Sequence, residues 1–308
     1  MSGPVSGPVS GPEGGPEGVS AWRPCVAGRY QLAEGARWAE GGLLFVDLLR
    51  GDLYRSRDCS GGPPERVLSL DMPLGAAARA LTGTEAGWIV AAGRGIALLY
   101  SGARPDWLAR PGDRPGRGIR MNDGGCDPSG RFWAGSMNAE AAPGAGSLYR
   151  TDHDGTVHEM LDGLTVPNGP AFSGDGRVMY LADSAHGTIT RYAVDLTTGG
   201  LMAGEPFATV PASKGRPDGM TVDVAGNLWV ALWGAGQVRC YRPDGAVLLS
   251  MTVPTPHPSS VAFGGGRMFV TTARHRLDLP GPLAGAVLAR PTRVVAPAAL
   301  SFGRAQAG

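Results

Sequence analysis

Four oxygen-bearing residues recur at one fixed distance from a repeated glycine. Each lies eight positions before a glycine that opens an apolar segment, and each has a further glycine one or two positions after it: Glu34, Asn122, Asn168 and Asp218. Carboxylate and amide oxygens are the ligands that hard cations such as Ca²⁺ prefer. If the fold brings these side chains together, two carboxylates and two amides would form a site for a divalent cation.

Turn formation is the alternative explanation for these residues. Asn-Gly and Asp-Gly are common turn sequences, so Asn168 or Asp218 alone would indicate a turn rather than a ligand. Turn chemistry does not account for Glu34, and the common spacing therefore favours a shared site. Arg79 and Pro258 hold the same offset in the two remaining repeats, and we assign both to packing.

A repeat of 40 to 50 residues underlies this spacing. A glycine followed closely by large strand-forming residues recurs with separations of 45, 43, 46, 50 and 40 residues, at Gly42, Gly87, Gly130, Gly176, Gly226 and Gly266. This period, with short β segments and Asp-Gly hairpins at 149–157 and 241–247, is typical of propeller blades. We predict an all-β, six-bladed β-propeller with four-stranded blades. A pair of β-sandwiches would show no such period.

The propeller also explains why the four residues could meet. They precede the second strand of their blades and so fall on the innermost strand, which lines the central channel. Equivalent positions converge on the axis, where glycine permits close backbone approach. The best candidate for a helix, 75–81, is short.

Composition limits the other possibilities. Net charge is +1 and the pI is about 7.7, so we expect neither nucleic acid nor a membrane as partner. Residues 1–20 repeat Ser-Gly-Pro-Val and Gly-Pro-Glu-Gly, and we predict a disordered tail there, followed by one catalytic propeller domain over 21–308. Four scattered cysteines favour a reduced, cytoplasmic protein, with a single bridge left open. We also expect a monomer.

Longer stretches carry a resemblance to a known family. Five stretches carry it: LAEGARW (32–38), IRMNDGGCDPSGRFWAGSM (119–137), VPNGPAFSGDGRVMYLADS (166–184), RPDGMTVDVAGNLWVALWG (216–234) and VAFGGGRMFVTTA (261–273). In these stretches the chain resembles the gluconolactonase/regucalcin family of six-bladed propellers, which includes sugar lactonases. The similarity spans about residues 25–290. By the same analogy, Tyr30–Leu32 and its neighbours would supply the strand that closes the ring.

The resemblance implies roles for single residues. The family's metal ligands fall on Glu34, Asn168 and Asp218, and its substrate-contacting residues fall on Arg120 and Asn122. One divalent ion is implied, with Ca²⁺ favoured and Zn²⁺, Mg²⁺ or Mn²⁺ also open. Arg120 lies two residues before Asn122 on an alternating strand, so both should point toward the same channel mouth.

These residues suggest metal-assisted hydrolysis of a sugar lactone to the aldonic acid. The cation would polarise the carbonyl and activate water, Asp218 would move the proton, and Arg120 and Asn122 would hold the substrate. A calcium-dependent esterase or phosphotriesterase and a non-enzymatic calcium-binding propeller remain alternatives. Asp183-Ser184 with His186 reads as a strand-end turn, and Asp152 to Gly155 reads as a hairpin.

Overall fold

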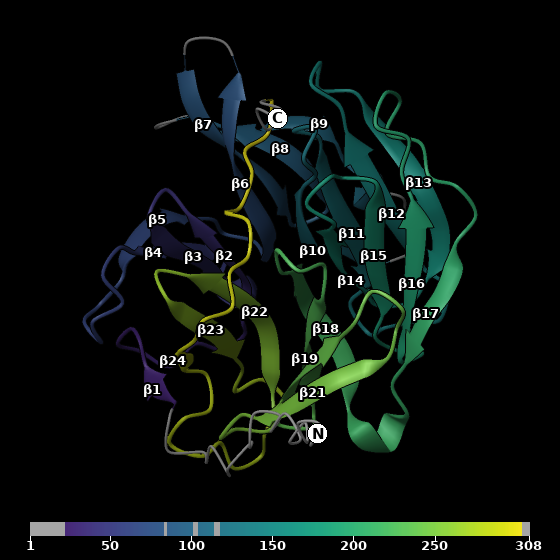
Figure 1. Ribbon diagram of the computed structural model, residues 1–308. Helices are drawn as coiled ribbons and strands as arrows, with labels where there is room; N and C mark the ends of the chain where they lie inside the picture. Colours follow the sequence, from purple (N-terminus) through teal and green to yellow (C-terminus); the bar gives the residue numbers. More distant parts are fainter. Residues whose placement is uncertain (1–21, 83–84, 101–103, 114–117, 304–308) are drawn as a thin grey trace, which may run out of the picture.

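The computed structural model describes residues 22–82, 85–100, 104–113 and 118–303, and these form a six-bladed β-propeller (Figure 1). The prediction of six four-stranded blades is confirmed. The segment considered as a helix, 75–81, lies inside a strand. The predicted tail over residues 1–20 lies outside the described residues.

Blades 1 to 5 each use four strands that are consecutive in sequence. Blades 1 and 2 contain β2 (Ala33–Ala39), β3 (Gly42–Asp47), β4 (Asp52–Ser56), β5 (Glu65–Ser69), β6 (Leu74–Thr82), β7 (Glu85–Ala92), β8 (Gly95–Leu99) and β9 (Asp106–Ala109). Blades 3 and 4 contain β10 (Ile119–Cys126), β11 (Phe132–Asn138), β12 (Gly146–Thr151), β13 (Val157–Leu164), β14 (Pro167–Phe172), β15 (Val178–Asp183), β16 (Thr188–Ala193) and β17 (Glu205–Thr209). Blade 5 contains β18 (Arg216–Val222), β19 (Leu228–Trp233), β20 (Gln237–Tyr241) and β21 (Val247–Thr252). In the described ranges, some strands are joined by short 3-10 turns: η2 (Leu48–Arg50), η3 (Pro111–Asp113) and η4 (Ala212–Lys214).

Blade 6 combines the first strand of the described chain with its last three strands. It contains β22 (Pro258–Gly264), β23 (Arg267–Thr272) and β24 (Val287–Pro291), with β1 (Arg23–Pro24) as its outer strand. The expectation that Tyr30–Leu32 closes the ring is therefore wrong. Strand β1 pairs with β24, whereas Leu32 forms an isolated bridge to Ala273. Because β1 is the outer strand of blade 6, the described chain begins at the rim of the propeller and continues to the axis, where it forms the inner strand of blade 1.

The first strand of every blade packs against the first strands of its neighbours, as expected for strands that line the channel. Apolar side chains fill the space between blades. Leu44 of blade 1 packs with Val90 of blade 2, and Trp133 of blade 3 packs with Leu181 of blade 4. Alternation along each strand places these residues between sheets and leaves the axial end of the strand for polar groups.

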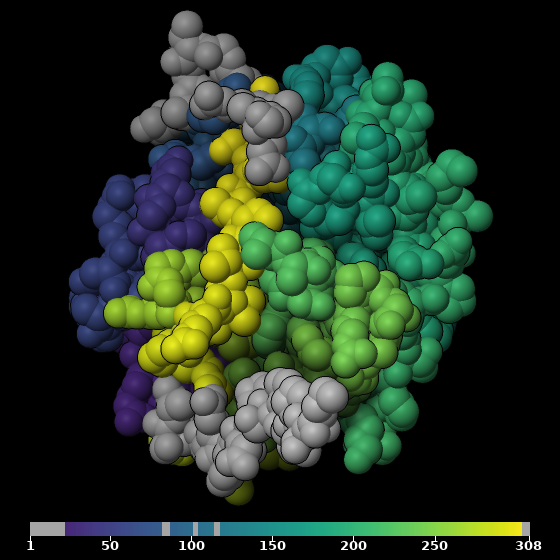
Figure 2. Space-filling view, in the orientation of Figure 1, coloured from purple at the N-terminus to yellow at the C-terminus, as the bar shows by residue number. Residues whose placement is uncertain are grey.

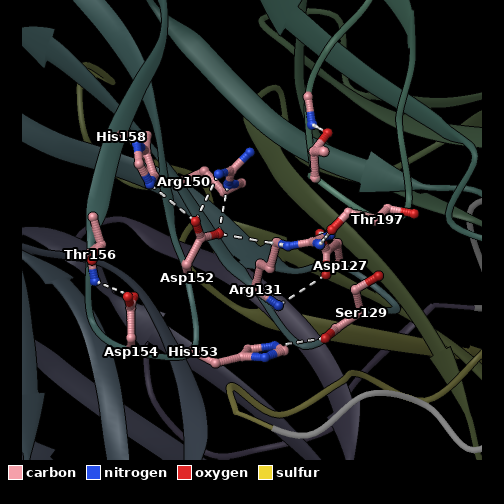
Figure 3. Close-up of polar contacts among 12 residues, drawn as sticks. Asp127, Ser129, Arg131, Arg150, Asp152, His153, Asp154, Thr156, His158 and Thr197 are labelled. Atoms are coloured by element: carbon pink, nitrogen blue, oxygen red, sulfur yellow. Dashed lines mark hydrogen bonds and ion pairs between the residues drawn. The ribbon is translucent and has the colours of Figure 1, made fainter.

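A buried aspartate organises the turn between the first two strands of blade 3 (Figure 3). Asp127 accepts hydrogen bonds from the backbone N–H of Arg131 at 3.0 Å and from Nε1 of Trp133 at 3.0 Å. In blade 5, Asp223 bonds Trp229 Nε1 at 2.8 Å in the same way. The Asp-Pro-x-Gly-Arg-Phe-Trp part of the sequence motif thus builds a turn and seats a tryptophan.

The C-terminal segment 295–303 crosses one end of the propeller (Figures 1 and 2, yellow). Val224 donates to the carbonyl of Val295 at 2.9 Å, and Phe302 donates to the carbonyl of Arg79 at 2.7 Å. The Phe302 ring is buried between blades 2 and 3. We call 295–303 the C-terminal strap. In the described part of the chain, no helix is long and apolar enough to cross a membrane.

Candidate functional site

The four predicted residues lie at a recurrent irregularity of the inner strands. Pairing is interrupted between Glu34 and Arg37 in β2, Met121 and Gly124 in β10, Asn168 and Ala171 in β14, and Pro217 and Met220 in β18. Each predicted residue is either the last paired residue before this bulge or the first one inside it. Bulges re-aim side chains and free backbone groups, which suits a site on the axis.

In blade 2, the offset of eight residues before the repeat glycine does not identify the position that corresponds to the four predicted residues. Strand β6 is nine residues long, and its irregularity lies at Gly75, between Leu74 and Ala76. Arg79 lies four residues further along, where it pairs with Glu40 at 3.3 Å and stacks over Trp88 at 4.5 Å. Its assignment to packing agrees with these contacts.

Gly75 has a steric reason to be glycine. A Cβ there would lie 2.2 Å from the carbonyl oxygen of Asn122. Blade 2 therefore contributes close backbone approach to the site instead of a polar side chain.

We call Glu34, Asn122, Asn168 and Asp218 the ring, and a chain of hydrogen bonds joins Asn122 to Asn168 and continues toward Asp218. Arg120 donates to Oδ1 of Asn122 at 2.8 Å, and Nδ2 of Asn122 donates to Oδ1 of Asn168 at 2.9 Å. Nδ2 of Asn168 then donates to Oγ of Ser184 at 2.8 Å, and this hydroxyl donates to the carbonyl of Pro217. The chain ends at the residue preceding Asp218, so it links blades 3, 4 and 5.

Glu34 and Asp218 are close enough to interact electrostatically, which places both in one site. Both are buried, with exposed fractions of 7% and 5%. Burial, followed by the negative charge of Asp123, raises the pKa of Glu34 to about 8. Burial, followed by the charge of Glu34, raises the pKa of Asp218 well above its ordinary value. The charge of Glu34 thus acts on Asp218, and the charge of Asp123 acts on both carboxyl groups.

A third buried carboxylate was not predicted. Asp123 accepts hydrogen bonds from the backbone N–H of Gly124 at 2.8 Å and of Gly169 at 3.0 Å, and it pairs with Arg37 at 3.4 Å. Because Gly169 follows Asn168, Asp123 fixes the backbone of a predicted ligand. The Asn-Asp-Gly sequence could have indicated a role for Asp123. It was missed because alternation along a regular strand places Asp123 on the opposite face from Asn122.

Ser184 was also missed as part of the site. Its hydroxyl joins Asn168 to blade 5, as described above. The adjacent Asp183 accepts from the backbone N–H groups of Thr165 and Val166 and contacts Nδ1 of His186 at 3.0 Å. Asp183 and His186 therefore form the expected strand-end turn and no triad. The hairpin at Asp152 to Gly155 is likewise observed between β12 and β13.

Histidine and arginine side chains lie close to Arg120 of the site. His257, which precedes Pro258 in blade 6, stacks on Trp233 of blade 5 with centroids 4.1 Å apart. Its Nδ1 lies 3.1 Å from the carbonyl of His275. Burial and the nearby charge of Arg276 lower the pKa of Arg120, whereas the charges of Glu34 and Asp218 act to raise it.

The opposite end of the channel holds a cavity of about 150 Å³. It is lined by the far ends of the inner strands and by 296–301 of the C-terminal strap, so it is separate from the ring. Within the ranges described here, no group of three or more His, Cys, Asp or Glu side chains is placed so that it could hold a metal ion by itself. The ring has only Glu34 and Asp218 as charged members, and amide oxygens complete the set.

The fold and the ring define a class: a six-bladed propeller with a buried, oxygen-rich polar site on its axis. The chain belongs to the SMP-30/gluconolactonase/LRE-like family, whose model matches residues 32–274. The predicted family resemblance is thereby confirmed.

Relatives in this family have several names. A pentonolactonase of Haloferax volcanii is 38% identical over 254 residues, covering 79% of this chain and 82% of its own. An L-arabinolactonase of Azospirillum brasilense is 35% identical over 283 residues, covering 86% and 90%. The crystal structure of a calcium-binding protein, regucalcin, from Agrobacterium tumefaciens matches with a TM-score of 0.83 and 28% identity, covering 92% of this chain and 97% of that one.

Proposed function

We propose that this protein is a divalent-metal-dependent lactonase that opens a sugar lactone to the aldonic acid. The observation that supports this best is the arrangement of Glu34, Asn168 and Asp218 beside the hydrogen-bonded pair Arg120–Asn122. Relatives named pentonolactonase and L-arabinolactonase align over more than three quarters of the chain. A purely structural ion would not require a partly exposed arginine next to its ligands.

The residues of the ring fit a hard divalent cation. Glu34 and Asp218 are two buried carboxyl groups whose pKa values are raised by burial and by a neighbouring carboxylate, Asp123 for Glu34 and Glu34 for Asp218. A cation would compensate both, and the amide oxygen of Asn168 retains a lone pair beyond its bond to Asn122. We assign Glu34, Asn168 and Asp218 as ligands, with Ca²⁺ favoured for an all-oxygen set and Zn²⁺, Mg²⁺ or Mn²⁺ as alternatives. When bound, such an ion would polarise the lactone carbonyl and lower the pKa of water.

Each residue of the site has a separate task in this proposal. Asp218 accepts the proton of the attacking water and returns it to the ring oxygen as the ester bond breaks. Arg120 and Asn122 hold the hydroxyls or the carbonyl oxygen of the lactone, with Arg120 fixed by its bond to Asn122. Asp123 and Ser184 act as positioning residues, because they hold the backbone or side chain of Asn168.

A panel of aldonolactones tests the proposal. Acid release is measured for five- and six-membered lactones, after chelation and after addition of Ca²⁺, Zn²⁺, Mg²⁺ or Mn²⁺. We expect turnover of at least one lactone that disappears with the metal and returns on reconstitution. Simple esters and phosphotriesters run in parallel decide between the lactonase and the wider esterase alternative.

The calcium-binding relative favours one further outcome, a propeller that binds calcium without catalysis. Calcium binding by calorimetry together with no turnover of any substrate in the panel would establish that alternative. Cytoplasmic location, expected from the cysteines, and a monomeric state both stay predictions.

A further inference from the structure

Two cysteines lie together where the first and last blades meet. Cys25 follows β1, the two-residue strand that closes blade 6, and Cys59 lies in the β4–β5 connection of blade 1. The carbonyl of Cys25 accepts a hydrogen bond from the backbone N–H of Gly61 at 2.9 Å. The thiols of Cys25 and Cys59 interact with each other and share one apolar cluster.

The last blade also contacts this point. Arg267, the first residue of β23, donates to the carbonyl of Cys59 at 2.9 Å, and the backbone N–H of Cys25 donates to the carbonyl of Val287 in β24 at 2.9 Å. The thiol pair therefore joins three segments: the entering chain, blade 1 and blade 6. We call this contact the blade seam.

The seam depends on few backbone hydrogen bonds. Strand β1 pairs with β24 through two residues, Arg23 with Ala289 and Pro24 with Leu288. A ring closed by so short a strand gains most from a covalent link at the same place. Such a link restricts the unfolded chain between residues 25 and 59.

We propose that Cys25 and Cys59 are a dithiol that oxidises to a disulfide and locks the blade seam. Cys59 attacks a low-molecular-weight disulfide such as oxidised glutathione and releases one glutathione thiolate. Cys25 then attacks the Sγ of Cys59, and the second glutathione leaves with the proton of Cys25. Two protein thiols are oxidised, and one glutathione disulfide is reduced to two thiols.

The surroundings of the two thiols suit this order of attack. Interaction with the Cys25 thiol, together with Ser56 and Arg267, lowers the pKa of Cys59 to about 7. The same contact and burial raise the pKa of Cys25. Cys59 also has a backbone φ of 47°, and its N–H donates to Oγ of Ser56 at 3.2 Å, which holds the residue in the left-handed region.

The remaining cysteines serve as internal controls. Cys240 is buried in the cluster between blades 5 and 6, and Cys126 packs between blades 2 and 3. Burial raises the pKa of both thiols, which makes each a weaker nucleophile. Neither lies at the blade seam.

The test equilibrates the full-length protein in glutathione redox buffers, both directly and during refolding from urea. Refolding removes burial as a barrier, since Cys25 and Cys59 are only 2% and 6% exposed. After quenching by alkylation, intact mass counts free thiols among the four, and peptide mapping without reduction locates the link. We expect two thiols to disappear, a Cys25–Cys59 peptide, and a Tm about 5–10 °C above that of the reduced protein.

Variants separate the seam from the other thiols. C126A/C240A should keep the full rise in Tm, and C25A or C59A should abolish it. If C25A or C59A fails to fold, the linkage map of the wild-type protein still decides. Four free thiols in the most oxidising refolding buffer, a link through Cys126 or Cys240, or a persistent glutathione adduct on Cys59 would each overturn the proposal.

Discussion

Single residues on the axis determine what this propeller can do. Asp218 and Glu34 have the same charge and are both buried, yet the proposal gives the proton to Asp218 alone. Their substitutions should therefore differ. Asp218→Asn keeps an oxygen ligand and loses the base, so kcat should fall by about 10²-fold or more while some metal remains bound. Glu34→Gln should mainly weaken metal binding, and excess cation should restore part of kcat.

Metal content and lactone turnover measured on the same preparations separate the two effects. Near-normal turnover in Asp218→Asn would show that another group moves the proton. Failure of excess cation to rescue Glu34→Gln would instead assign Glu34 a role in the reaction itself.

Arg120 belongs to the substrate side of the ring. Arg120→Ala should leave metal content unchanged, because the Arg120 guanidinium contacts Asn122 and the Met121 carbonyl rather than the proposed ligands. If Arg120 holds ground and transition states alike, KM rises; if it meets the developing oxyanion, kcat falls by about 10²–10³-fold. The exposed Arg242, replaced in the same way, is the matched control. Loss of metal from Arg120→Ala alone would contradict this division of roles.

At the scale of elements, one short turn accounts for much of the most specific sequence motif. Asp127→Ala removes the acceptor of the Trp133 indole and of the Arg131 backbone, leaving two donors unpaired inside the protein. We expect a loss of about 2–4 kcal/mol in the free energy of unfolding, measured with urea. Asp175→Ala, at an exposed turn of blade 4, should cost much less. Lactone KM should be unchanged in both, and a changed KM would place Asp127 in the site.

The stack of His257 on Trp233 makes a prediction about pH. Burial, together with the charges of His275 and Arg276, lowers the pKa of His257 below its ordinary 6.5. A depressed histidine pKa means that the unfolded chain binds the proton more tightly, so stability is lost as pH falls below 6.5. Between pH 7 and 5 the wild-type Tm should fall more than that of His257→Gln. Equal slopes of Tm against pH would show that His257 titrates normally.

How far the sequence predicts these elements depends on how regular each blade is. The repeat period predicted six blades. The offset of eight residues identified ring positions only in blades whose inner strand and following turn have the same combined length. Blade 2 broke the offset because β6 is longer, and its ring position is Gly75, a residue without a side chain to recognise. Asp123 was missed because period-two alternation assigns it to the opposite face from Asn122. The bulge changes that geometry, and no propensity in the sequence marks it.

The ends of the chain complete the molecule at two different places. The entering segment closes blade 6 through β1, and the C-terminal strap crosses the channel end opposite the ring. Closure was predicted in the wrong segment because a two-residue strand has no periodic pattern to detect. The strap reads as a proline-rich loop in sequence, and only its contacts with four blades reveal that it covers the cavity.

The strap therefore should stabilise the propeller without taking part in catalysis. Phe302 is 1% exposed, its N–H donates to the Arg79 carbonyl, and its carbonyl accepts from Leu81 at 3.0 Å. Phe302→Ala removes the buried ring and leaves a cavity between blades 2 and 3, at a cost of about 3–5 kcal/mol. Val295→Ala is the control within the same segment, because Val295 is 59% exposed.

Urea unfolding gives the stability difference, and lactone kinetics at 25 °C on the folded fraction give the second readout. Phe302→Ala should unfold at lower urea with KM and kcat unchanged. A raised KM in folded protein would mean that the two ends of the channel communicate, and the strap would then have to be counted as part of the site.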